Sequence, residues 1–372
     1  MARVALVCEP PHGGVAEHVF QLALGLGEHG HEAVVFGPHE FEPAARLAAA
    51  GLPFRVVGLR RDYAHPHRDA AVIASVARAL RAGGFELVHA HSAKAGVLGR
   101  LAARATRMPS VYTPHGFPFV GDVSAARKRF ATLIERRLAP ATAAIICVCE
   151  AERRVAAASR LTPRHLAVVH NGCPPERGIA PDPALVALRG AGLAVGAISV
   201  LRREKGLDVL VRAAPRILAA VSEASVAIVG DGPERDTLEQ CARTLGLDAE
   251  DRFAFVPFAP PSERYLHILD VLAVPSAWDA FPIGVLEAQA CGVPQVASAV
   301  GGIPEAVVPE TGILVPAGEP ERLADAVIEL LRDRGRREAM AAASRARHAE
   351  LFTVDRMVAG TAAVYDRVLE QA

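Results

Sequence analysis

Short apolar runs alternate with amphipathic segments along the first half of the chain. Strands with little polar alternation, each followed by a helix, are typical of a parallel sheet covered on both faces. We therefore predict strands in the runs VALVCEP, AVVFGP, FRVVGL, ELVHAHS, SVYTPHG, AAIICVCE and LAVVHNG, with helices over about residues 14–29, 42–50, 68–82, 95–106 and 124–139.

The same alternation restarts in the second half. The segment between the halves, residues 173–190, begins with a proline-rich stretch and is predicted to be a linker. The following apolar runs are GAISVL, SVAIVGDGP, FAFVPF, VLAVPS, PQVAS and GILVP. Helices are predicted over about residues 206–220, 234–245, 261–268 and 319–332, and directly after Phe281.

Two such halves predict an α/β protein with two doubly wound domains, over residues 1–172 and 191–352. The chain beyond residue 335 has a helical pattern, and we expect a last helix, 353–372, to pack back on the first domain. Ligands of such sheets bind at the carboxyl ends of the strands, so the expected active site is a cleft between two facing domains.

Composition narrows the choice of partners. Lys+Arg and Asp+Glu both number 41, which argues against a general attraction to nucleic acid. No apolar run is long enough to span a bilayer, and the short run at the start is expected to be a strand rather than a signal peptide. The six cysteines lack zinc-ligand spacing. Cys147 and Cys149 are expected on one face of a strand as small buried residues, and the expected location is the cytoplasm.

The segment 276–298, SAWDAFPIGVLEAQACGVPQVAS, combines two acids with a predicted helix N-terminus. Pro282 suits the first turn of that helix, because proline has no N–H to leave unpaired there. The positive end would point free N–H groups at an anion such as phosphate, from Ile283, Gly284 and Val285. Asp279 and Glu287 would lie on either side. This arrangement suits a sugar nucleotide, and the alternative is a plain strand–turn–helix unit with solubilising acids.

Candidate ligand-binding residues also follow strands of the first half. Gly13 and Gly14 open a helix that carries His18, which indicates either a close approach to a phosphate or acceptor, or an ordinary tight turn. His89 and His91 end another strand and share a face. Zinc is one interpretation, but no third ligand is evident in the sequence, so hydrogen bonding in the wall of the cleft is favoured.

The next strand ends in Thr-Pro-His-Gly, which places His115 where it can contact a substrate hydroxyl or be satisfied by backbone. In the second half, Arg202, Arg203 and Lys205 occupy the loop after a strand. Cations beside a helix N-terminus suit a diphosphate leaving group, although a solvated surface run is the alternative. No closely spaced pair of aspartates is found in a predicted cleft loop, so we expect these cations and the helix dipole to act in place of Mg²⁺.

Eight strings, in this order, resemble the family 4 glycosyltransferases, which are retaining enzymes with two Rossmann-like domains in the GT-B fold. The strings are GGVAEHV, HAHSAKAGVLGR, YTPHGF, HNG, EKGLDVL, VGDGPE, SAWDAFPIGVLEAQACGVPQVAS and VGGIPEAV, and they run over nearly the whole chain. The resemblance implies transfer of a hexosyl unit from a nucleotide sugar to an acceptor hydroxyl with retained anomeric configuration, and no metal or other cofactor.

The resemblance also implies residue roles. Gly14 would lie at the boundary of diphosphate and acceptor, and His115 would contact the donor sugar. Lys205, with a nearby arginine, would hold the diphosphate, while Glu287 would bind the ribose hydroxyls. The sugar hydroxyls would meet Asp279 and the backbone of Phe281, Pro282, Ile283 and Gly284. The amides of Val285 and Leu286 would complete the phosphate site.

This chain departs from the family pattern at two positions. Asp279 stands where the family usually has glutamate, so the acid is one methylene shorter. Val200 stands where the family usually has arginine, five residues before the lysine, and Arg202 or Arg203 is the candidate replacement.

The favoured reaction has no protein nucleophile. The departing diphosphate, stabilised by Lys205 and the amides 283–286, would itself accept the acceptor's proton on the same face of the sugar. The alternatives are a sugar-nucleotide epimerase of the same fold and a non-catalytic sugar-nucleotide sensor. By resemblance, the acceptor would be a glycan, a lipid-linked molecule or a small molecule, in polysaccharide, glycolipid or cell-envelope glycan synthesis.

The predicted helix 124–139 is basic and amphipathic. It carries five cations, with apolar residues between them: Arg127, Lys128, Arg129, Arg136 and Arg137, and Phe130, Leu133, Ile134 and Leu138. It could dock on an anionic membrane that holds a lipid-linked acceptor. The alternative is an ordinary core-packed helix with a solvated basic face.

Overall fold

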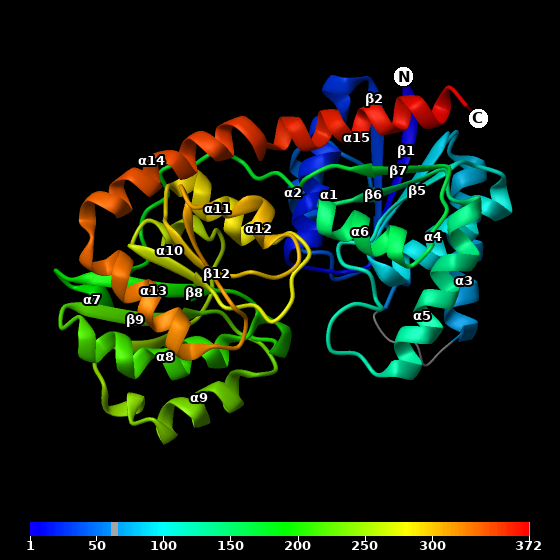
Figure 1. The fold of residues 1–372 in the computed structure, drawn as a ribbon. Coiled ribbons are helices and arrows are strands. Elements are labelled where there is room, and N and C mark those ends of the chain that lie inside the picture. The colour runs from blue at the N-terminus through cyan, green and yellow to red at the C-terminus, as the bar shows by residue number, and fades with distance from the viewer. Residues whose placement is uncertain (61–65, 372) are drawn as a thin grey trace. The chain divides into compact units, whose positions relative to one another are not determined.

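The computed structural model describes residues 1–60 and 66–371, and the chain divides into two compact units. Unit 1 comprises Met1–Gly172 together with Val354–Ala372, and unit 2 comprises Cys173–Thr353. Each unit has a parallel β-sheet with helices on its faces (Figure 1). Within the described residues, every helix is too short or too polar to cross a bilayer.

The sheet of unit 1 has seven parallel strands in the order β3-β2-β1-β4-β5-β6-β7. The strands are β1 (Ala2–Cys8), β2 (His31–Gly37), β3 (Phe54–Val56), β4 (Leu87–His91), β5 (Ser110–Thr113), β6 (Ala144–Cys147) and β7 (His165–Val168). The order reverses between β1 and β4, which pair in parallel from Val4–Leu87 to Cys8–His91. Nearly every side chain of β1 and β4 is buried, as the continuous apolar runs predict.

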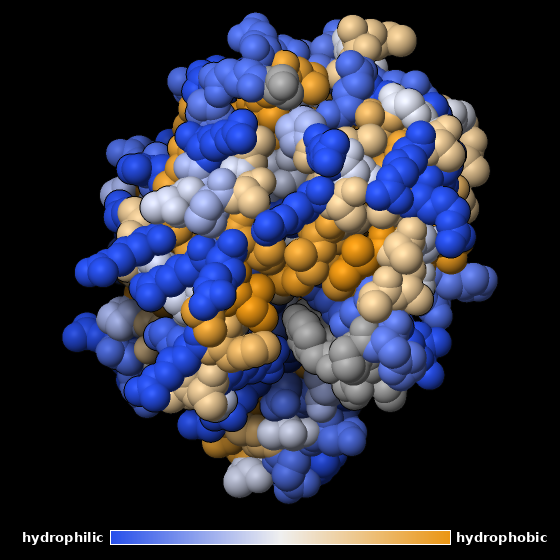
Figure 2. Space-filling model, turned by 90° about the vertical axis from the view of Figure 1, so that its right-hand side faces the viewer, coloured by the Kyte–Doolittle hydropathy of each residue, from blue (hydrophilic) through white to orange (hydrophobic). Residues whose placement is uncertain are grey.

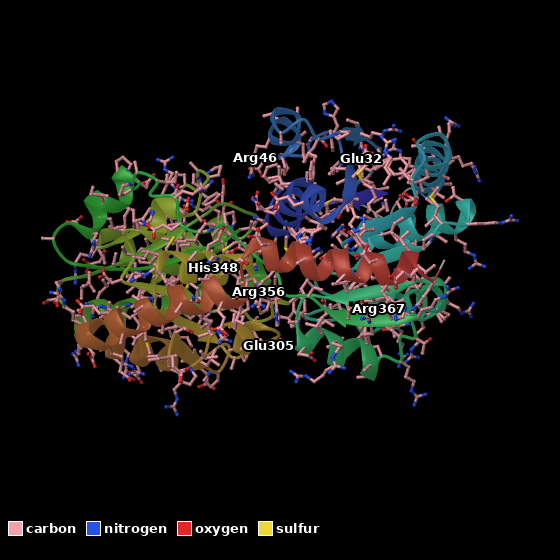
Figure 3. All side chains as sticks on the ribbon, turned by 90° about the horizontal axis from the view of Figure 1, so that it is seen from above. Glu32, Arg46, Glu305, His348, Arg356 and Arg367 are labelled. Atoms are coloured by element: carbon pink, nitrogen blue, oxygen red, sulfur yellow. The ribbon has the colours of Figure 1, made fainter. Side chains whose placement is uncertain are left out.

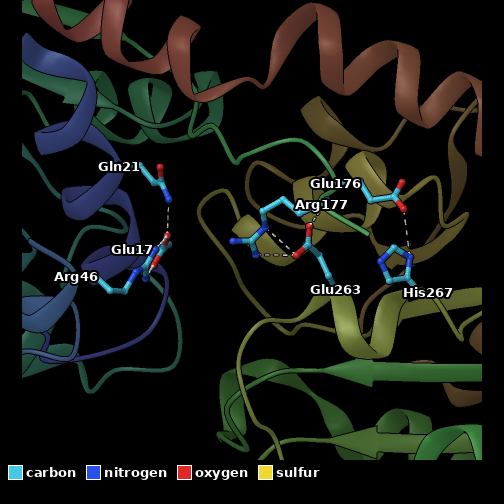
Figure 4. Close-up of polar contacts among 7 residues, drawn as sticks. All are labelled: Glu17, Gln21, Arg46, Glu176, Arg177, Glu263 and His267. Carbon is cyan, nitrogen blue, oxygen red and sulfur yellow. Dashed lines mark hydrogen bonds and ion pairs between the residues drawn. The ribbon is translucent and has the colours of Figure 1, made fainter. Parts of the chain in front are cut away.

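Helices cover both faces of this sheet. They are α1 (Gly14–Gly25), α2 (Ala44–Ala49), α3 (Pro66–Ala82), α4 (Ala93–Thr106), α5 (Ala125–Leu138), α6 (Glu150–Ala158) and the C-terminal α15 (Val354–Leu369), with 3₁₀ turns at Leu26–His29 and Ala139–Ala141. α1 is tied to α2 through Glu17, which accepts hydrogen bonds from Arg46 at 2.6 Å and from Gln21 at 2.6 Å (Figure 4).

The C-terminal helix α15 belongs to unit 1, because its apolar face joins the core beside α1. Met357, Val358 and Tyr365 are buried there, and a Cβ on Gly25 would lie 2.7 Å from Val358. Only glycine leaves room for this close helix–helix approach. The Tyr365 hydroxyl reaches Nδ1 of His89 at 2.5 Å, so the last helix contacts the end of a central strand.

The sheet of unit 2 has six parallel strands in the order β10-β9-β8-β11-β12-β13. They are β8 (Leu193–Ile198), β9 (Ala224–Val229), β10 (Phe253–Val256), β11 (Val271–Val274), β12 (Gln295–Ser298) and β13 (Gly312–Val315). The order reverses between β8 and β11. Both sheets therefore have a topological switch point, which is where doubly wound sheets bind ligands.

The helices of unit 2 bury two apolar clusters, one against each face of the sheet. They are α7 (Pro183–Arg189), α8 (Leu207–Ala220), α9 (Arg235–Thr244), α10 (Glu263–Leu266), α11 (Ile283–Cys291), α12 (Ile303–Ala306), α13 (Pro320–Arg332) and α14 (Arg334–Leu351), with 3₁₀ turns at Arg203–Lys205 and Leu247–Ala249. α13 packs on α8, and α14 packs on α11.

The segment 173–190 is not a free linker, because the structure includes it in unit 2 and α7 forms within it. Arg177 binds buried Glu263 at 2.6 Å, and Glu176 pairs with His267 at 3.5 Å (Figure 4). His348 lies on α14 (Figure 3), and its Nε2 is 3.1 Å from the backbone carbonyl of Cys173. These contacts fix the proline-rich stretch to helices distant in sequence.

Two local expectations are wrong. Cys149 does not continue the strand of Cys147, because β6 ends at Cys147 and the Cys149 side chain caps α6 by accepting the Glu152 N–H. Both thiols are nonetheless buried. Pro282 lies before the first turn of α11, in an extended conformation at the N-cap, rather than inside that turn.

Candidate functional site

The candidate residues of unit 2 gather at its switch point, at the carboxyl ends of β8 and β11. The chain leaves β8 into the 3₁₀ turn Arg203–Lys205 and leaves β11 into the loop that carries Asp279. Lys205 Nζ lies 2.5 Å from Asp279 Oδ2, with side-chain exposures of 28% and 14%. The two residues with predicted roles at diphosphate and sugar thus form one partly shielded ion pair. A ligand that binds either Lys205 or Asp279 must compete with the charge of the other residue.

Close backbone contacts hold Lys205 and Asp279 next to each other. Gly206 has φ of +60°, and a Cβ there would lie 2.2 Å from the Pro275 carbonyl. The Ala277 N–H donates to the Glu204 carbonyl at 2.9 Å. A main-chain hydrogen bond therefore joins the turn Arg203–Lys205, here called the lysine turn, to the loop that carries Asp279, here called the aspartate loop. Glu204 had no predicted role. Its contribution is through the backbone, which leaves no signature in residue type.

The glycines after β12 support the other side of the aspartate loop. A Cβ on Gly301 would lie 1.6 Å from the Asp279 carbonyl, and the Gly302 N–H donates to the Ala280 carbonyl at 2.7 Å. The VGDGP turn supports the lysine turn in a similar way, because Leu201 N–H donates to the Asp231 carbonyl at 2.9 Å. Paired glycines after strands are the sequence signal for such close backbone contacts. This signal does not identify which loop lies against the glycines.

The predicted anion site lies at the N-terminus of α11, which begins at Ile283. Its first two N–H groups, on Ile283 and Gly284, have no acceptor within the helix. The Val285 N–H, predicted to be free, instead donates to the Pro282 carbonyl at 3.1 Å. A bound phosphate would meet fewer free amides than predicted, unless that tight first turn opens.

The other residues predicted to bind the donor lie on the same helix or directly before it. Phe281 is buried, with its ring 5.6 Å from that of Phe352, so only its backbone is available to a ligand. Leu286 is also fully buried. Glu287 is half-buried on the second turn of α11. The pKa of the Cys173 thiol is raised mainly by burial, and the charge of Glu287 raises it further.

Both arginine candidates for the cation that the resemblance implies lie at the start of the lysine turn. Arg202 is the residue before the 3₁₀ turn and Arg203 its first residue, and Arg202 Nη1 is 4.0 Å from Glu204 Oε1. Arg203 is exposed and Arg202 half-buried. Both therefore lie beside Lys205 on the same turn.

The candidate residues of unit 1 gather at its own switch point. Gly13 has φ of +84° and ψ of −169° directly before α1, a conformation that only glycine adopts readily. A Cβ there would meet nothing within 4 Å, so the backbone conformation requires the glycine and crowding does not. The Gly13 turn places Gly14 at the start of α1 and His18 one turn further on, where its side chain is buried.

Three histidines from three elements come together at this edge of the sheet. His18 comes from α1, His91 from the end of β4 and His115 from the loop after β5. His91 Nδ1 lies 3.1 Å from His115 Nε2, and the His18 and His115 ring centroids are 4.6 Å apart. Burial lowers the pKa of His18 to about 4 and holds the pKa values of His91 and His115 well below 6.5. All three are therefore neutral hydrogen-bonding groups near pH 7.

His89 is not available to an acceptor, although the sequence made it a candidate. Its Nδ1 lies 2.5 Å from the Tyr365 hydroxyl and its Nε2 2.8 Å from Thr113 Oγ1, and the side chain is fully buried. Both ring nitrogens are thus engaged within unit 1. Strand parity places His89 and His91 on one face, and their rings are 3.9 Å apart, but parity does not reveal which of them the last helix covers.

Glu152 is a site residue that sequence reasoning missed. It lies in the first turn of α6, is buried, and accepts the Gly116 N–H at 2.6 Å and the Val148 N–H at 2.8 Å. Its carboxyl therefore holds the turn that follows His115, whose own φ is +52°. Burial raises the pKa of Glu152 to about 7, although the two amide hydrogen bonds lower it.

Glu152 is expected to make stability depend on pH. A carboxyl whose pKa is higher in the folded chain contributes its full stabilisation below the pKa of the unfolded chain, 4.5. That stabilisation is lost as the pH rises through the pKa of the folded chain, about 7. Glu152→Gln cannot ionise, so its free energy of unfolding should lack this decrease, which is on the order of 3 kcal/mol. Urea unfolding at pH 5 and pH 8 measures the difference between the two proteins.

Glu150→Gln is the matched control, because Glu150 lies in the same turn and its side chain is 44% exposed. This variant should keep the pH dependence of the original protein. A Glu152→Gln variant with that same dependence would contradict a protonated Glu152 in the folded chain.

Two family models match the chain, one for each half. The model for "Glycosyltransferase Family 4" matches residues 12–177, and that for "Glycosyl transferases group 1" matches residues 191–347. The first match contains the histidine cluster, and the second contains Lys205, Asp279 and α11.

Several curated proteins are similar over nearly the whole chain. The D-inositol 3-phosphate glycosyltransferase of Mycobacterium marinum is 30% identical, covering 96% of this chain and 82% of that protein. The protein with that name from Mycobacterium bovis is 32% identical, covering 96% and 79%.

Solved structures share the fold at low sequence identity. Anabaena HepE in complex with UDP and glucose has a TM-score of 0.83 at 22% identity, covering 99% of this chain and 100% of that chain. The putative UDP-N-acetylglucosamine 2-epimerase of Listeria monocytogenes has a TM-score of 0.67 at 14% identity, covering 99% and 98%. A UDP-binding protein and a putative epimerase therefore share this architecture.

Proposed function

This chain belongs to the family 4 glycosyltransferases, and on that premise we propose a specific reaction for it. It moves a hexosyl unit from a nucleotide-diphosphate sugar to an acceptor hydroxyl, with retained anomeric configuration and no required metal. The supporting observation is the Lys205–Asp279 pair at the switch point of unit 2, in the loop that leads to α11. A diphosphate sugar needs a cation and amides for its phosphates and an acceptor for its hydroxyls, and this group of residues supplies all three.

In the proposed reaction the C1–oxygen bond to the diphosphate breaks while the acceptor oxygen bonds to C1 on the same face. The acceptor's proton passes to the departing diphosphate, and the nucleoside diphosphate leaves. Lys205 and the first amides of α11 stabilise the charge that develops on the leaving group. No carboxylate is assigned as nucleophile, because Asp279 is paired with Lys205 and both oxygens of Glu152 hold backbone amides.

The donor proposed first is a UDP-sugar, since HepE structures contain UDP and UDP-glucose. A panel of nucleotide sugars can be screened by thermal shift, because a ligand that binds the folded state raises the melting temperature by mass action. The donor that binds is then incubated with candidate acceptors. D-inositol 3-phosphate comes first, because relatives about 30% identical carry that name. Lipid-linked and free glycans follow, as expected for polysaccharide, glycolipid or cell-envelope glycan synthesis.

The same incubations separate the competing functions. A glycosyltransferase forms a glycoside only when the acceptor is present, and the product should keep the anomeric configuration of the donor. Interconversion of the nucleotide sugar without acceptor would instead indicate an epimerase. Binding without turnover on any acceptor would indicate a sensor.

For lipid-linked acceptors, we propose that α5 contacts an anionic membrane surface. Two apolar side chains of α5 are exposed among the helix's cations: Phe130 is 65% exposed and Leu133 51% exposed. Figure 2 shows one face of the molecule, on which hydrophobic residues are exposed among hydrophilic ones. Apolar side chains among Lys and Arg suit the boundary between anionic headgroups and acyl chains. The proposed location is the cytoplasmic face of the membrane, because the six cysteines are unpaired.

Vesicle sedimentation tests this contact. The protein should bind vesicles of phosphatidylglycerol and phosphatidylcholine at low salt and bind less as salt rises. Replacing Phe130 and Leu133 by serine should lower the bound fraction several-fold, since about 1 kcal/mol per lost apolar contact is a fivefold change. Val186→Ser, which removes an apolar side chain that is 47% exposed on unit 2, is the control. Equal binding by all three proteins would exclude α5 as the contact.

A further inference from the structure

The histidine cluster of unit 1 has the composition of a metal site. One ring nitrogen each from His18, His91 and His115 lies within 4.8 Å of the others. The His91–His115 nitrogens, 3.1 Å apart, are already close to the separation of about 3.4 Å that a tetrahedral zinc ion with 2.0–2.1 Å bonds imposes. His18 would have to move inward by roughly 1 Å, which a side-chain rotation supplies.

Two ring nitrogens of the cluster lack a hydrogen-bond partner in the part of the chain that the structure describes. Among the described residues, His18 Nδ1 and His91 Nε2 are buried without a hydrogen-bond partner. An unsatisfied polar atom in the interior costs free energy, so each such atom calls for an explanation. The orphaned His18 Nδ1, at the ligand-binding edge of the sheet, points to an ion or ligand that completes it.

We propose that His18, His91 and His115 bind one zinc ion, with the fourth position open to water or an anion. Neutral imidazole is the form that binds zinc, and three imidazoles suit zinc better than magnesium or calcium. His89 is excluded as a ligand because Tyr365 and Thr113 occupy both of its nitrogens. The sequence placed His89 and His91 together but did not show the other two ligands, His18 and His115, which tertiary structure brings from α1 and from the loop after β5.

Zinc at this site would inhibit rather than assist the proposed transfer. Ligation would withdraw His115 from any contact with the donor sugar, so the ion and the reaction would compete for one imidazole. This consequence rests on the proposed function, whereas zinc binding itself does not. The two can therefore fail separately.

Equilibrium dialysis of the untagged, chelator-treated full chain against Zn²⁺ measures the binding directly, without any nucleotide sugar. One tight ion per chain is expected, with affinity lowered at least about 10-fold in His18→Ala and in His91→Gln, because each loses a ligand. His39→Ala removes an exposed histidine outside the cluster and should bind as the original protein does. With Co²⁺ in place of zinc, the visible absorption of a tetrahedral site should appear and should be lost in the cluster variants.

Melting temperatures keep the result interpretable if a variant is less stable. Zinc should raise the melting temperature of the original protein and of His39→Ala, and should not raise that of a folded His91→Gln. Unchanged affinity in both cluster variants, or the absence of a tight ion in the original protein, would overturn the proposal. Zinc binding with undiminished turnover would keep the site and remove the inhibitory consequence.

Discussion

Lys205→Ala is expected to lower kcat by about two to three orders of magnitude, which is the typical effect of removing one preorganised group that stabilises transition-state charge. Lys205 is the ammonium at the switch point of unit 2, 2.5 Å from Asp279, on a turn fixed by Gly206 and the Glu204 carbonyl. As the leaving diphosphate gains charge, Lys205 supplies a full positive charge at that point, and Arg202 or Arg203 is the second cation assigned beside it. Single-turnover rates with the donor found by screening separate this effect on chemistry from weaker donor binding.

Two further variants make the Lys205 result specific. Lys128→Ala removes an exposed lysine from unit 1 and should leave turnover of a soluble acceptor unchanged. Asp279→Glu restores the longer acid usual in the family, and its effect should depend on the hexose, since this acid is assigned to the sugar. A Lys205→Ala enzyme with nearly unchanged kcat would refute the assignment of leaving-group stabilisation to this lysine.

Glu135→Ala is expected to destabilise the protein by about 3–5 kcal/mol, the usual cost of leaving one charge of a buried ion pair alone. Arg100 Nη2 lies 2.9 and 2.8 Å from the two Glu135 oxygens, and the side chains are 2% and 1% exposed. Arg100 also donates to the Gly96 carbonyl and stacks over Tyr112 at 4.0 Å, so it cannot turn out to water. Urea unfolding followed by circular dichroism measures the change.

Controls on the ion pair distinguish a stranded charge from a simple loss of packing. Replacing both partners, as in Arg100→Leu with Glu135→Leu, should recover part of the loss because no charge remains buried. Glu150→Ala breaks an exposed pair with Arg153, 45% and 44% exposed, and should cost less than about 1 kcal/mol. A Glu135→Ala change as small as this control would show that the buried pair contributes little. Arg100 lies on α4 and Glu135 on α5, so a large loss would identify the pair as an anchor of α5.

The alternation of strands and helices was predictable because both faces of each sheet are buried, which forces continuous apolar runs on the strands. The helices that were missed have weak local signals. α6 begins with a cysteine as N-cap and carries four charged residues in nine. α7 begins with Pro183 inside a stretch expected to be a linker, and its stability comes from burying Leu185 in unit 2. In both, packing rather than the local pattern decides that a helix forms.

The sequence by itself determined which residues lie at the carboxyl ends of strands, because apolar runs and the glycine turns after them are local features. It thereby singled out Lys205, Asp279 and the three histidines as candidates. Only the tertiary structure decided how they combine. The strand order places β8 beside β11 and so pairs Lys205 with Asp279, which are 74 residues apart. The neighbouring strands β1, β4 and β5 bring His18 to His91 and His115, while α15 covers His89. Strand order and helix docking depend on burial summed over a whole unit, and no single segment contains that information.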